Sequence, residues 1–599
     1  MCGIFCYLEN GAKQELKEGY NSSECIDVQD CFANNERRGP DNVHSVFIGK
    51  NISGEWNAEF RGWVLWTQGS SMTSQPLQEG MGNILLWNGD IFSGPLAQNV
   101  VSDTEYLYTA IQQSGDIVQT FRSVEGPYSF IYYDQSSKLL YFGRDIIGRH
   151  SLLIKIVPEK RRMLISSVAS KNLDKWMEIP SLGIYVMDLK RDDFNLALFP
   201  WKEILGIGDS LNKHLGIYIN IKSCILSIEK NEITSEPLSE DSSFLTLKSA
   251  GHNVREIMMN FMENSDIAKR VDEVLKHLRE SVRVRVEKKP NYCKNCIELA
   301  LREKTVKCIH SKIGLLFSGG LDSTILAAIT HDFVPEGESI DLINVAFEKA
   351  EKEAKNFTGK TSQSEIRQKR KQINFEVPDR KTGRLAWEEL KRNYPTRKWN
   401  FIESNVTQAE LEKCLQTRIC HLVYPLRTIL DESLGCALWF AARGCGTLVN
   451  TNESYESPCR ILLLGMGADE LFGGYTRHRT ILKRRGWVGL AEELQTEINR
   501  ISERNLGRDN RVVSDHGRQS RLPYLDNNFI KYVTSLKPWE RCCPTDHLPP
   551  GLGDKLLLRL CAFKLDLKET SNFPKRAFQF GSRIAKSHEN ARDISKWLS

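Results

Sequence analysis

Apolar residues along this chain change their spacing near its middle. Up to about residue 189 they form short runs separated by turn residues, a pattern that predicts strands. The run 84–87 stops at Asn88-Gly89-Asp90, a strong turn signal. Two further runs, 130–133 and 139–143, flank a short polar segment and predict a hairpin. The first third of the chain is therefore expected to be rich in short strands.

The second half shows a different pattern, in which helices and strands alternate. From residue 266 apolar side chains recur at helical spacing, and runs that predict strands follow at 313–317, 340–347 and 460–464. A glycine-rich turn and a helix through residues 326–329 come after the first of these runs. Such alternation favours an open, mostly parallel sheet covered by helices. Residues 191–251 have no clear pattern and are expected to be irregular.

Composition and charge limit the class of protein. A chain of 599 residues is expected to hold several domains, and 41% apolar with 26% charged residues is typical of globular proteins. A net charge of +5 is small for this length and favours neither nucleic acid nor a membrane as partner. The start shows no signal-peptide pattern, and the sixteen cysteines are scattered. We expect a cytoplasmic protein with reduced thiols; the oligomeric state is not indicated.

Cys2 is a candidate nucleophile because it directly follows Met1. If Met1 is removed, the thiol and the α-amino group belong to one residue. The amine has a pKa near 8 and can take the proton of the thiol, as in enzymes with an N-terminal threonine nucleophile. The alternative is an inert cysteine that happens to be second in the chain.

A candidate phosphate-binding loop lies at residues 318–323, which read Ser-Gly-Gly-Leu-Asp-Ser between a predicted strand and a predicted helix. Glycines let successive N–H groups point at one anion, and the helix N-terminus adds partial positive charge. Asp322 could hold a Mg²⁺ ion beside the phosphates. The loop is neither a Walker A motif nor a dinucleotide fingerprint. The alternative is an ordinary turn between strand and helix.

These residues carry a family resemblance. The hexapeptide resembles the pyrophosphate loop of N-type ATP pyrophosphatases. Together with Cys2-Gly3-Ile4 it resembles the glutamine-dependent asparagine synthetases, and more closely their divergent branch, the asparagine synthetase domain-containing proteins. The resemblance implies an α+β N-terminal-nucleophile sandwich followed by an α/β open-sheet ATP-pyrophosphatase domain. The implied boundaries are 2–189 for a class II glutamine amidotransferase domain, 190–265 for a connecting region, and 266–599 for an asparagine synthetase-like domain with charged insertions at 287–312 and 348–374.

The resemblance implies roles for residues of the first domain. Cys2 would attack the side-chain amide of glutamine, and Asn88 and Gly89 would hold the oxyanion. Asp103 would pair with the α-ammonium group of glutamine. The family usually places a glutamine-binding Arg at the position that here holds Val64, and Arg61 lies three residues away.

In the second domain the resemblance implies an ATP site. Asp322 and Asp469 would also be close to Mg²⁺, and Lys555 would neutralise the leaving pyrophosphate. The reaction would join the side-chain carboxylate of aspartate to AMP, and ammonia would then displace AMP to give asparagine. The residues implied to bind ATP are Leu316, Ser318, Gly319, Gly320, Asp322, Ser323, Val345, Gly465, Asp469 and Lys555.

One departure from the family pattern affects the chemistry. Leu464 and Met466 stand where the family signature has Ser and Glu, and the Glu manages the proton of the attacking nitrogen. A thioether cannot act as a base, and losing one acid–base group costs about 10²–10⁴-fold in rate. Three hypotheses therefore stay open: an asparagine synthetase-like enzyme, a related enzyme that uses another carboxylate, or a pseudoenzyme that acts as a scaffold or regulator.

A possible zinc site lies in the first charged insertion. Cys293-x-x-Cys296 and Cys308-x-His310 combine thiolates and an imidazole at a spacing that could hold a tetrahedral Zn²⁺ ion. The alternative is a set of unligated thiols in a loop.

Overall fold

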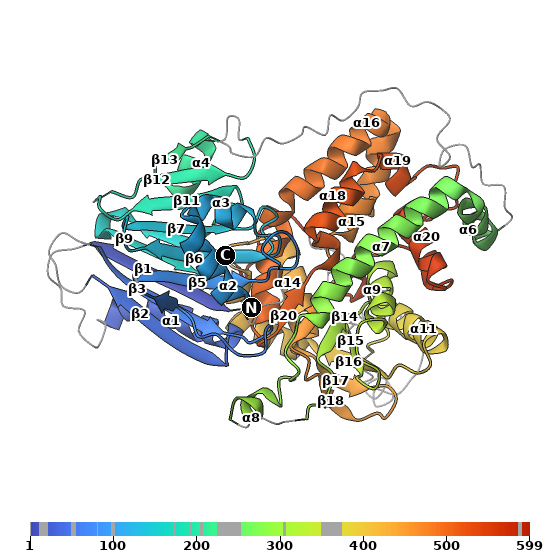
Figure 1. Cartoon of the computed structure of the whole chain (residues 1–599). Coiled ribbons are helices and arrows are strands. Elements are labelled where there is room, and N and C mark those ends of the chain that lie inside the picture. The colour runs from blue at the N-terminus through green and yellow to red at the C-terminus, as the bar shows by residue number, and fades with distance from the viewer. Residues whose placement is uncertain are drawn as a thin grey trace, which may run out of the picture.

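The chain folds into three β-sheets, two in its first part and one in its second (Figure 1). This mixed α/β arrangement agrees with the hydrophobic pattern. The computed structural model describes residues 2–10, 22–49, 56–80, 82–97, 102–172, 174–191, 193–203, 208–223, 253–302, 307–348, 374–584 and 590–598.

Two sheets face each other in the first part of the chain. The first is antiparallel throughout, in the order β10 (Met177–Glu178), β8 (Leu153–Val157), β9 (Arg162–Ser166), β1 (Gly3–Asn10), β3 (Trp56–Val64) and β2 (Asn42–Ile48). The second has the order β13 (Ile219–Ile221), β12 (Leu196–Pro200), β11 (Gly183–Asp188), β7 (Leu139–Arg144), β6 (Tyr128–Asp134), β5 (Asn83–Gly89) and β4 (Leu77–Glu79). The predicted hairpin is confirmed, since β6 pairs antiparallel with β7.

In the first part of the chain, successive side chains of each strand point to opposite faces of the sheet, and this produces a layered packing. On β1, Ile4, Cys6 and Leu8 are fully buried against residues of the second sheet such as Ile131. The outer face of the first sheet is covered by α1 (Ser22–Arg38), where Phe5 packs with Cys31. Helices α2 (Asp103–Ser114) and α3 (Ile117–Arg122) cover the outer face of the second. The layers are therefore helix, sheet, sheet and helix.

The expected irregular connecting region contains regular structure, so this expectation is wrong for residues 196–200, 208–215 and 219–221. Strand β12 pairs antiparallel with β11, and β13 pairs parallel with β12, which extends the second sheet. Helix α4 (Gly208–Leu215) connects these two strands. Leu196 and Leu198 point into the core between the sheets. Strands of five and three residues are too short to give a clear alternation, so the sequence pattern did not reveal them.

The third sheet has a parallel centre, as predicted. Its order is β18 (Ser454–Glu456), β17 (Cys445–Leu448), β16 (Trp399–Val406), β15 (Ile340–Phe347), β14 (Ile313–Leu316), β19 (Ile461–Leu463) and β20 (Gln519–Arg521). All neighbours from β16 to β20 are parallel, whereas β17 and β18 are antiparallel at one edge. The predicted insertion at 348–374 lies outside the described residues, apart from its two ends.

Helices cover both faces of the third sheet. The long helix α7 (Ser265–Glu287), which runs across Figure 1 in green, packs with α6 (Val254–Glu263), α9 (Leu321–His331) and α20 (Leu556–Lys564). Helices α14 (Ile429–Arg443) and α17 (Gly507–Ser514) contribute to the core on the other side. Among the described residues no helix is both long and apolar enough to cross a membrane.

Buried polar contacts join the first part of the chain to the second. Arg149 Nη1 donates to the Leu525 carbonyl oxygen at 2.8 Å, and Gln519 Nε2 donates to Asp90 Oδ2 at 2.7 Å. Gln519 belongs to β20, at the edge of the third sheet. Asp90 follows β5 directly, so the end of β5 that carries the predicted oxyanion residues faces the second half of the chain.

Two candidate active sites

Cys2 lies at the start of β1 and lines a cavity of about 50 Å³. The Gln75 side chain is aimed at it: Nε2 is 3.6 Å from Cys2 Sγ, while Gln75 Oε1 accepts a 2.7 Å hydrogen bond from the Trp87 N–H. Burial raises the pKa of the Cys2 thiol. A thiol in this position therefore needs a nearby base to become nucleophilic.

Asn88 and Gly89 lie beside Cys2. They do not form the predicted turn but end strand β5. The Cys2 N–H donates to Asn88 Oδ1 at 3.0 Å, and Asn88 Nδ2 donates to Ser129 Oγ at 3.3 Å, so the amide is held from both sides. A Cβ atom on Gly89 would lie 2.5 Å from the Trp87 ring, which explains the glycine. Gly89 lines the cavity of Cys2.

Asp103, predicted to bind glutamine, lines the same cavity from the first turn of α2. Its carboxylate accepts a 2.7 Å hydrogen bond from the Ile91 N–H. Burial raises the pKa of Asp103 to about 6. The structure thus brings Cys2, Asn88, Gly89 and Asp103 to one place.

A lysine near Asp103 comes from the other half of the chain. Val64 lines the cavity, whereas Arg61 pairs with Glu59 at 2.9 Å and is not among its described lining residues. A neighbouring cavity of about 450 Å³ shares Asp103 and is lined by residues 287–292, which begin at the last residue of α7. There Lys288 Nζ donates to the Ile91 carbonyl oxygen at 2.7 Å. No sequence motif marks Lys288 as a binding residue, because it is close to Asp103 only in the folded chain.

A separate cavity in the second half of the chain, called the second cavity below, measures about 220 Å³ and lies where β14, β15 and β19 end. Every residue predicted to bind ATP lines it except Gly319. Gly319 has a φ of +74°, and a Cβ atom there would lie 2.4 Å from Gly383 Cα in α11 (Pro378–Asn393). The close packing of the loop on α11 therefore requires this glycine. Parallel sheets commonly bind ligands at this end of their strands.

Two aspartates in this cavity share a buried lysine. Lys555 Nζ is 2.7 Å from both Asp322 Oδ2 and Asp469 Oδ1, and its side chain is 3% exposed. Burial opposes each charge, yet Lys555 and Lys575 hold the pKa of Asp469 below its usual range. The aspartates in turn raise the pKa of Lys555. Asp469 and Lys555 are therefore both charged at neutral pH.

Other charged residues that line this cavity were not predicted from the sequence, among them Lys575, Arg576 and Asp379. Lys575 Nζ lies 2.5 Å from Asp469 Oδ2, and Arg576 also lines the cavity. Asp379, at the start of α11, contributes a carboxylate whose Oδ2 has no hydrogen-bond partner among the described residues. Burial raises the pKa of Asp379 to about 7. These residues are distant in sequence from the glycine loop, and no local motif marks them.

The departures from the family signature also line this cavity. Leu464 and Met466 both belong to its wall, and Met466 packs against the apolar cluster behind the sheet. The position expected to hold a glutamate thus presents a thioether to the cavity.

The four predicted zinc ligands form a cluster of their own. The ligand atoms of Cys293, Cys296, Cys308 and His310 all lie within 4.8 Å of one another. Fourteen cysteines among the described residues, these three included, are free thiols.

Comparison with known proteins gives close relatives over nearly the whole chain. Asparagine synthetase domain-containing protein 1 of Homo sapiens is 36% identical over 635 residues, which cover 98% of this chain and 95% of that protein. The protein of the same name from Mus musculus is 36% identical and covers 99% of both chains. A Gallus gallus protein named asparagine synthetase (glutamine-hydrolysing) is 23% identical over 97% of this chain and 84% of its own.

Two other comparisons add little. No family model matches the chain. A solved glutamine phosphoribosylpyrophosphate amidotransferase from B. subtilis covers 32% of this chain and 50% of its own, with 16% identity and a TM-score of 0.23, too low to support an argument about the fold.

The mixed α/β fold carries an N-terminal cysteine cavity and a glycine-loop cavity in one chain, and the relatives of the chain are named for asparagine synthetase. The identity to curated relatives over nearly the full chain makes the assignment more specific. The chain belongs to the family of asparagine synthetase domain-containing proteins.

Proposed function

We propose that this protein forms an amide at the expense of ATP, with glutamine as the nitrogen source and aspartate as the acceptor. Aspartate, ATP and glutamine would yield asparagine, AMP, pyrophosphate and glutamate. The observation that carries the proposal is that one cavity is lined by all the expected ATP-binding residues except Gly319. An N-terminal-nucleophile domain would supply ammonia, and an ATP-pyrophosphatase domain would use it.

The charges of the second cavity suit a bound triphosphate. The N-terminus of α9 and the ammonium groups of Lys555 and Lys575 would offset the phosphate charges, and Leu316 and Val345 would lie on the adenine side. The carboxylate oxygens of Asp322 and Asp469 are the type of ligand that Mg²⁺ prefers, so these residues fit a Mg²⁺ site. When bound, Mg²⁺ would neutralise part of the charge on the pyrophosphate.

The acceptor carboxylate would attack the α-phosphorus of ATP, and pyrophosphate would leave. Ammonia would then attack the activated carbonyl carbon, AMP would leave, and the nitrogen would lose a proton. Met466 cannot take this proton. Asp379 lines the same cavity with a pKa of about 7, a value that suits a base at neutral pH, and we assign it this role.

In the first cavity the thiolate of Cys2 would attack the glutamine amide carbon, release ammonia and leave a thioester for water to hydrolyse. The reaction requires removal of Met1, because the α-amino group of Cys2 is then the base. Gly89 N–H and the Asn88 amide would stabilise the oxyanion. Asp103 would pair with the α-ammonium group when its carboxyl is ionised.

Recognition of the glutamine carboxylate needs a cation, and the charged described residues that line the Cys2 cavity are Asp90 and Asp103. Lys288 is the candidate, since it lines the adjoining cavity together with Asp103. This arrangement would make glutamine binding depend on the second half of the chain.

One observation favours a second candidate function. Met466 replaces the family's glutamate on the cavity wall, and a protein that had lost amide synthesis could keep ATP binding as a scaffold or regulator. The two functions differ in a measurable product.

The test supplies ATP, Mg²⁺, aspartate and ammonium, which bypasses Cys2. We expect pyrophosphate and asparagine in equal amounts from the natural protein and neither from Asp322→Ala. Calorimetry with ATP establishes that the protein used is folded and binds nucleotide. ATP binding without either product would reject amide synthesis from aspartate and favour the scaffold.

A further inference from the structure

The segment between α7 and β14 has little apolar packing of its own. Its described residues include the short helix α8 (Ile297–Arg302), and the side chain of Ile309 is 71% exposed. Leu299 is 49% exposed. Ordering each residue costs about 1–2 kcal/mol of backbone entropy, and the buried apolar side chains of the described part, such as Ile297, are few. Further interactions would therefore help to hold the segment.

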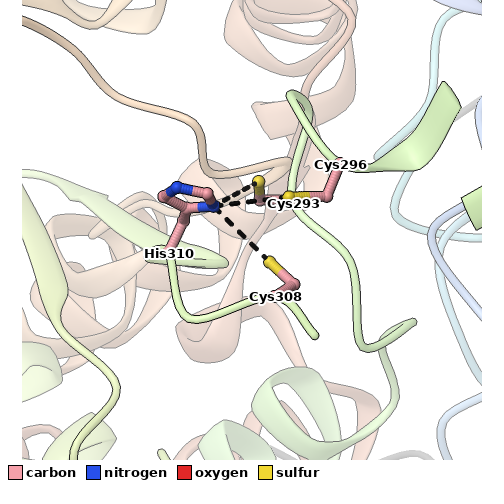
Figure 2. Close-up of side chains that lie close together, drawn as sticks. All are labelled: Cys293, Cys296, Cys308 and His310. Carbon is pink, nitrogen blue, oxygen red and sulfur yellow. Dashed lines mark hydrogen bonds between the residues drawn. The ribbon is translucent and has the colours of Figure 1, made fainter. Parts of the chain in front are cut away.

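Figure 2 shows four side chains of this segment that point toward one another. Cys293 and Cys296 come from the turn that opens α8, where the Cys296 N–H donates to the Cys293 carbonyl oxygen at 3.2 Å. Cys308 and His310 come from the loop that enters β14. The Nδ1 atom of His310 lies 3.5, 3.4 and 3.9 Å from the sulfur atoms of Cys293, Cys296 and Cys308.

These distances agree with a tetrahedral metal site. With Zn–S bonds of about 2.3 Å and a Zn–N bond of about 2.05 Å, a tetrahedral angle puts sulfur and nitrogen about 3.6 Å apart. The three measured separations lie on either side of this value. We infer that Cys293, Cys296, Cys308 and His310 bind a structural Zn²⁺ ion. Four protein ligands close the coordination shell and leave no position for a substrate.

The surroundings of the cluster support this inference. Cys293 and Cys296 are buried, Cys308 is half-buried and His310 is exposed, so the ion would be shielded on one side and reachable on the other. The backbone is also fixed from outside: the Lys294 N–H donates to the Pro458 carbonyl oxygen at 2.8 Å.

The zinc site would fix a wall of the cavity beside the Cys2 cavity, in which Lys288 is proposed to bind the glutamine carboxylate. Cys293 follows Tyr292, the last of residues 287–292, which line the cavity beside Asp103. The Tyr292 ring lies 5.9 Å from the Trp66 ring of the first domain. Helix α7 holds one end of this run and zinc would hold the other. This consequence rests on the proposed function, whereas zinc binding itself does not.

The experiment measures metal in the full chain, expressed with added zinc and purified without a metal-affinity step. Inductively coupled plasma mass spectrometry should find about one zinc ion per chain. Cys308→Ser and His310→Ala should each lose most of it, whereas Cys414→Ser, a half-buried thiol outside the cluster, should keep it. Folded natural protein that lacks zinc, iron in its place, or equal zinc in all four proteins would overturn the inference.

A second readout covers the possibility that the variants fold poorly. Removing metal from the natural protein with a chelator should speed proteolytic cleavage within residues 287–312, and zinc should reverse this while magnesium should not. Unchanged cleavage would contradict a structural role. Neither measurement uses glutamine or ATP. Zinc in a protein that forms no amide would therefore reject the proposed function and leave the zinc site standing.

Discussion

Replacing Lys555 with Met would leave two carboxylates facing each other across the second cavity. Lys555 Nζ contacts Asp322 at 2.7 and 2.8 Å and Asp469 at 2.7 Å. Methionine keeps the length of the side chain but removes the charge. It is also unbranched at Cβ, which matters because Lys555 has a φ of +56°.

The loss of stability follows from burial. Removing one partner of a buried ion pair costs about 3–5 kcal/mol, because the other charge remains unpaired. The side chains of Asp322 and Asp469 are 23% and 19% exposed, and Asp469 keeps its contact with Lys575. Both facts favour the lower limit, so we expect a loss of about 3 kcal/mol in the free energy of unfolding. ATP binding should weaken as well.

Urea unfolding followed by tryptophan fluorescence measures the effect, and a double variant tests its cause. Adding Asp322→Asn to Lys555→Met removes one unpaired charge and should recover at least about 1 kcal/mol. The control is Lys568→Met, which breaks a partly exposed pair with Asp566 and should cost less than about 1 kcal/mol. The reasoning fails if Lys555→Met loses no more stability than this control, or if Asp322→Asn adds to the loss.

Three further predictions concern the carboxyl and amino groups of the two cavities. The kcat/KM for glutamine hydrolysis should fall as pH drops through about 6, where Asp103 becomes protonated; a flat profile would contradict its role. The pKa of Asp379 is about 7 in the folded state against an ordinary value of 3.8, so the folded protein loses stability as pH rises from 3.8 to 7. Urea unfolding of Asp379→Asn should therefore show a gain in the free energy of unfolding of up to about 4 kcal/mol at pH 8 and much less at pH 5. Ammonium-dependent synthesis by the same variant should fall about 10²-fold or more. Lys288→Met should raise the KM for glutamine and leave ammonium-dependent synthesis unchanged, and an unchanged KM, as expected for the exposed Lys276→Met, would contradict the assignment.

Part of the fold is readable from the sequence because its signals are local. Strands β14, β15 and β19 are almost wholly buried, so most of their residues are apolar; Asp341 and Asn344 in β15 are the polar exceptions. Helix α7 buries one face and keeps helical spacing. By contrast, β12 and β13 have only five and three residues, too few to give a periodic signal, although each pairs with a strand close to it in the sequence.

The residues of the candidate sites also fall into those that a local motif predicts and those that only tertiary packing brings together. The glycine loop and the cysteine pairs are compact patterns, and the structure brings their members together. Asp379, Lys288 and Lys575 reach their cavities through tertiary packing, which no spacing reveals. Arg61 shows the converse: it is near Val64 in sequence, yet its guanidinium carbon lies 4.0 Å from the centre of the Phe32 ring, and its charge is paired with Glu59.

The central claim is that the second cavity joins a carboxylate to AMP. Aspartate labelled with ¹⁸O in its side-chain carboxylate tests this directly, in the presence of ATP, Mg²⁺ and ammonium. If the carboxylate attacks the α-phosphorus, one labelled oxygen must leave with AMP when ammonia displaces it, and mass spectrometry should find labelled AMP beside asparagine. Unlabelled AMP, or no AMP from folded protein that binds ATP, would contradict the account.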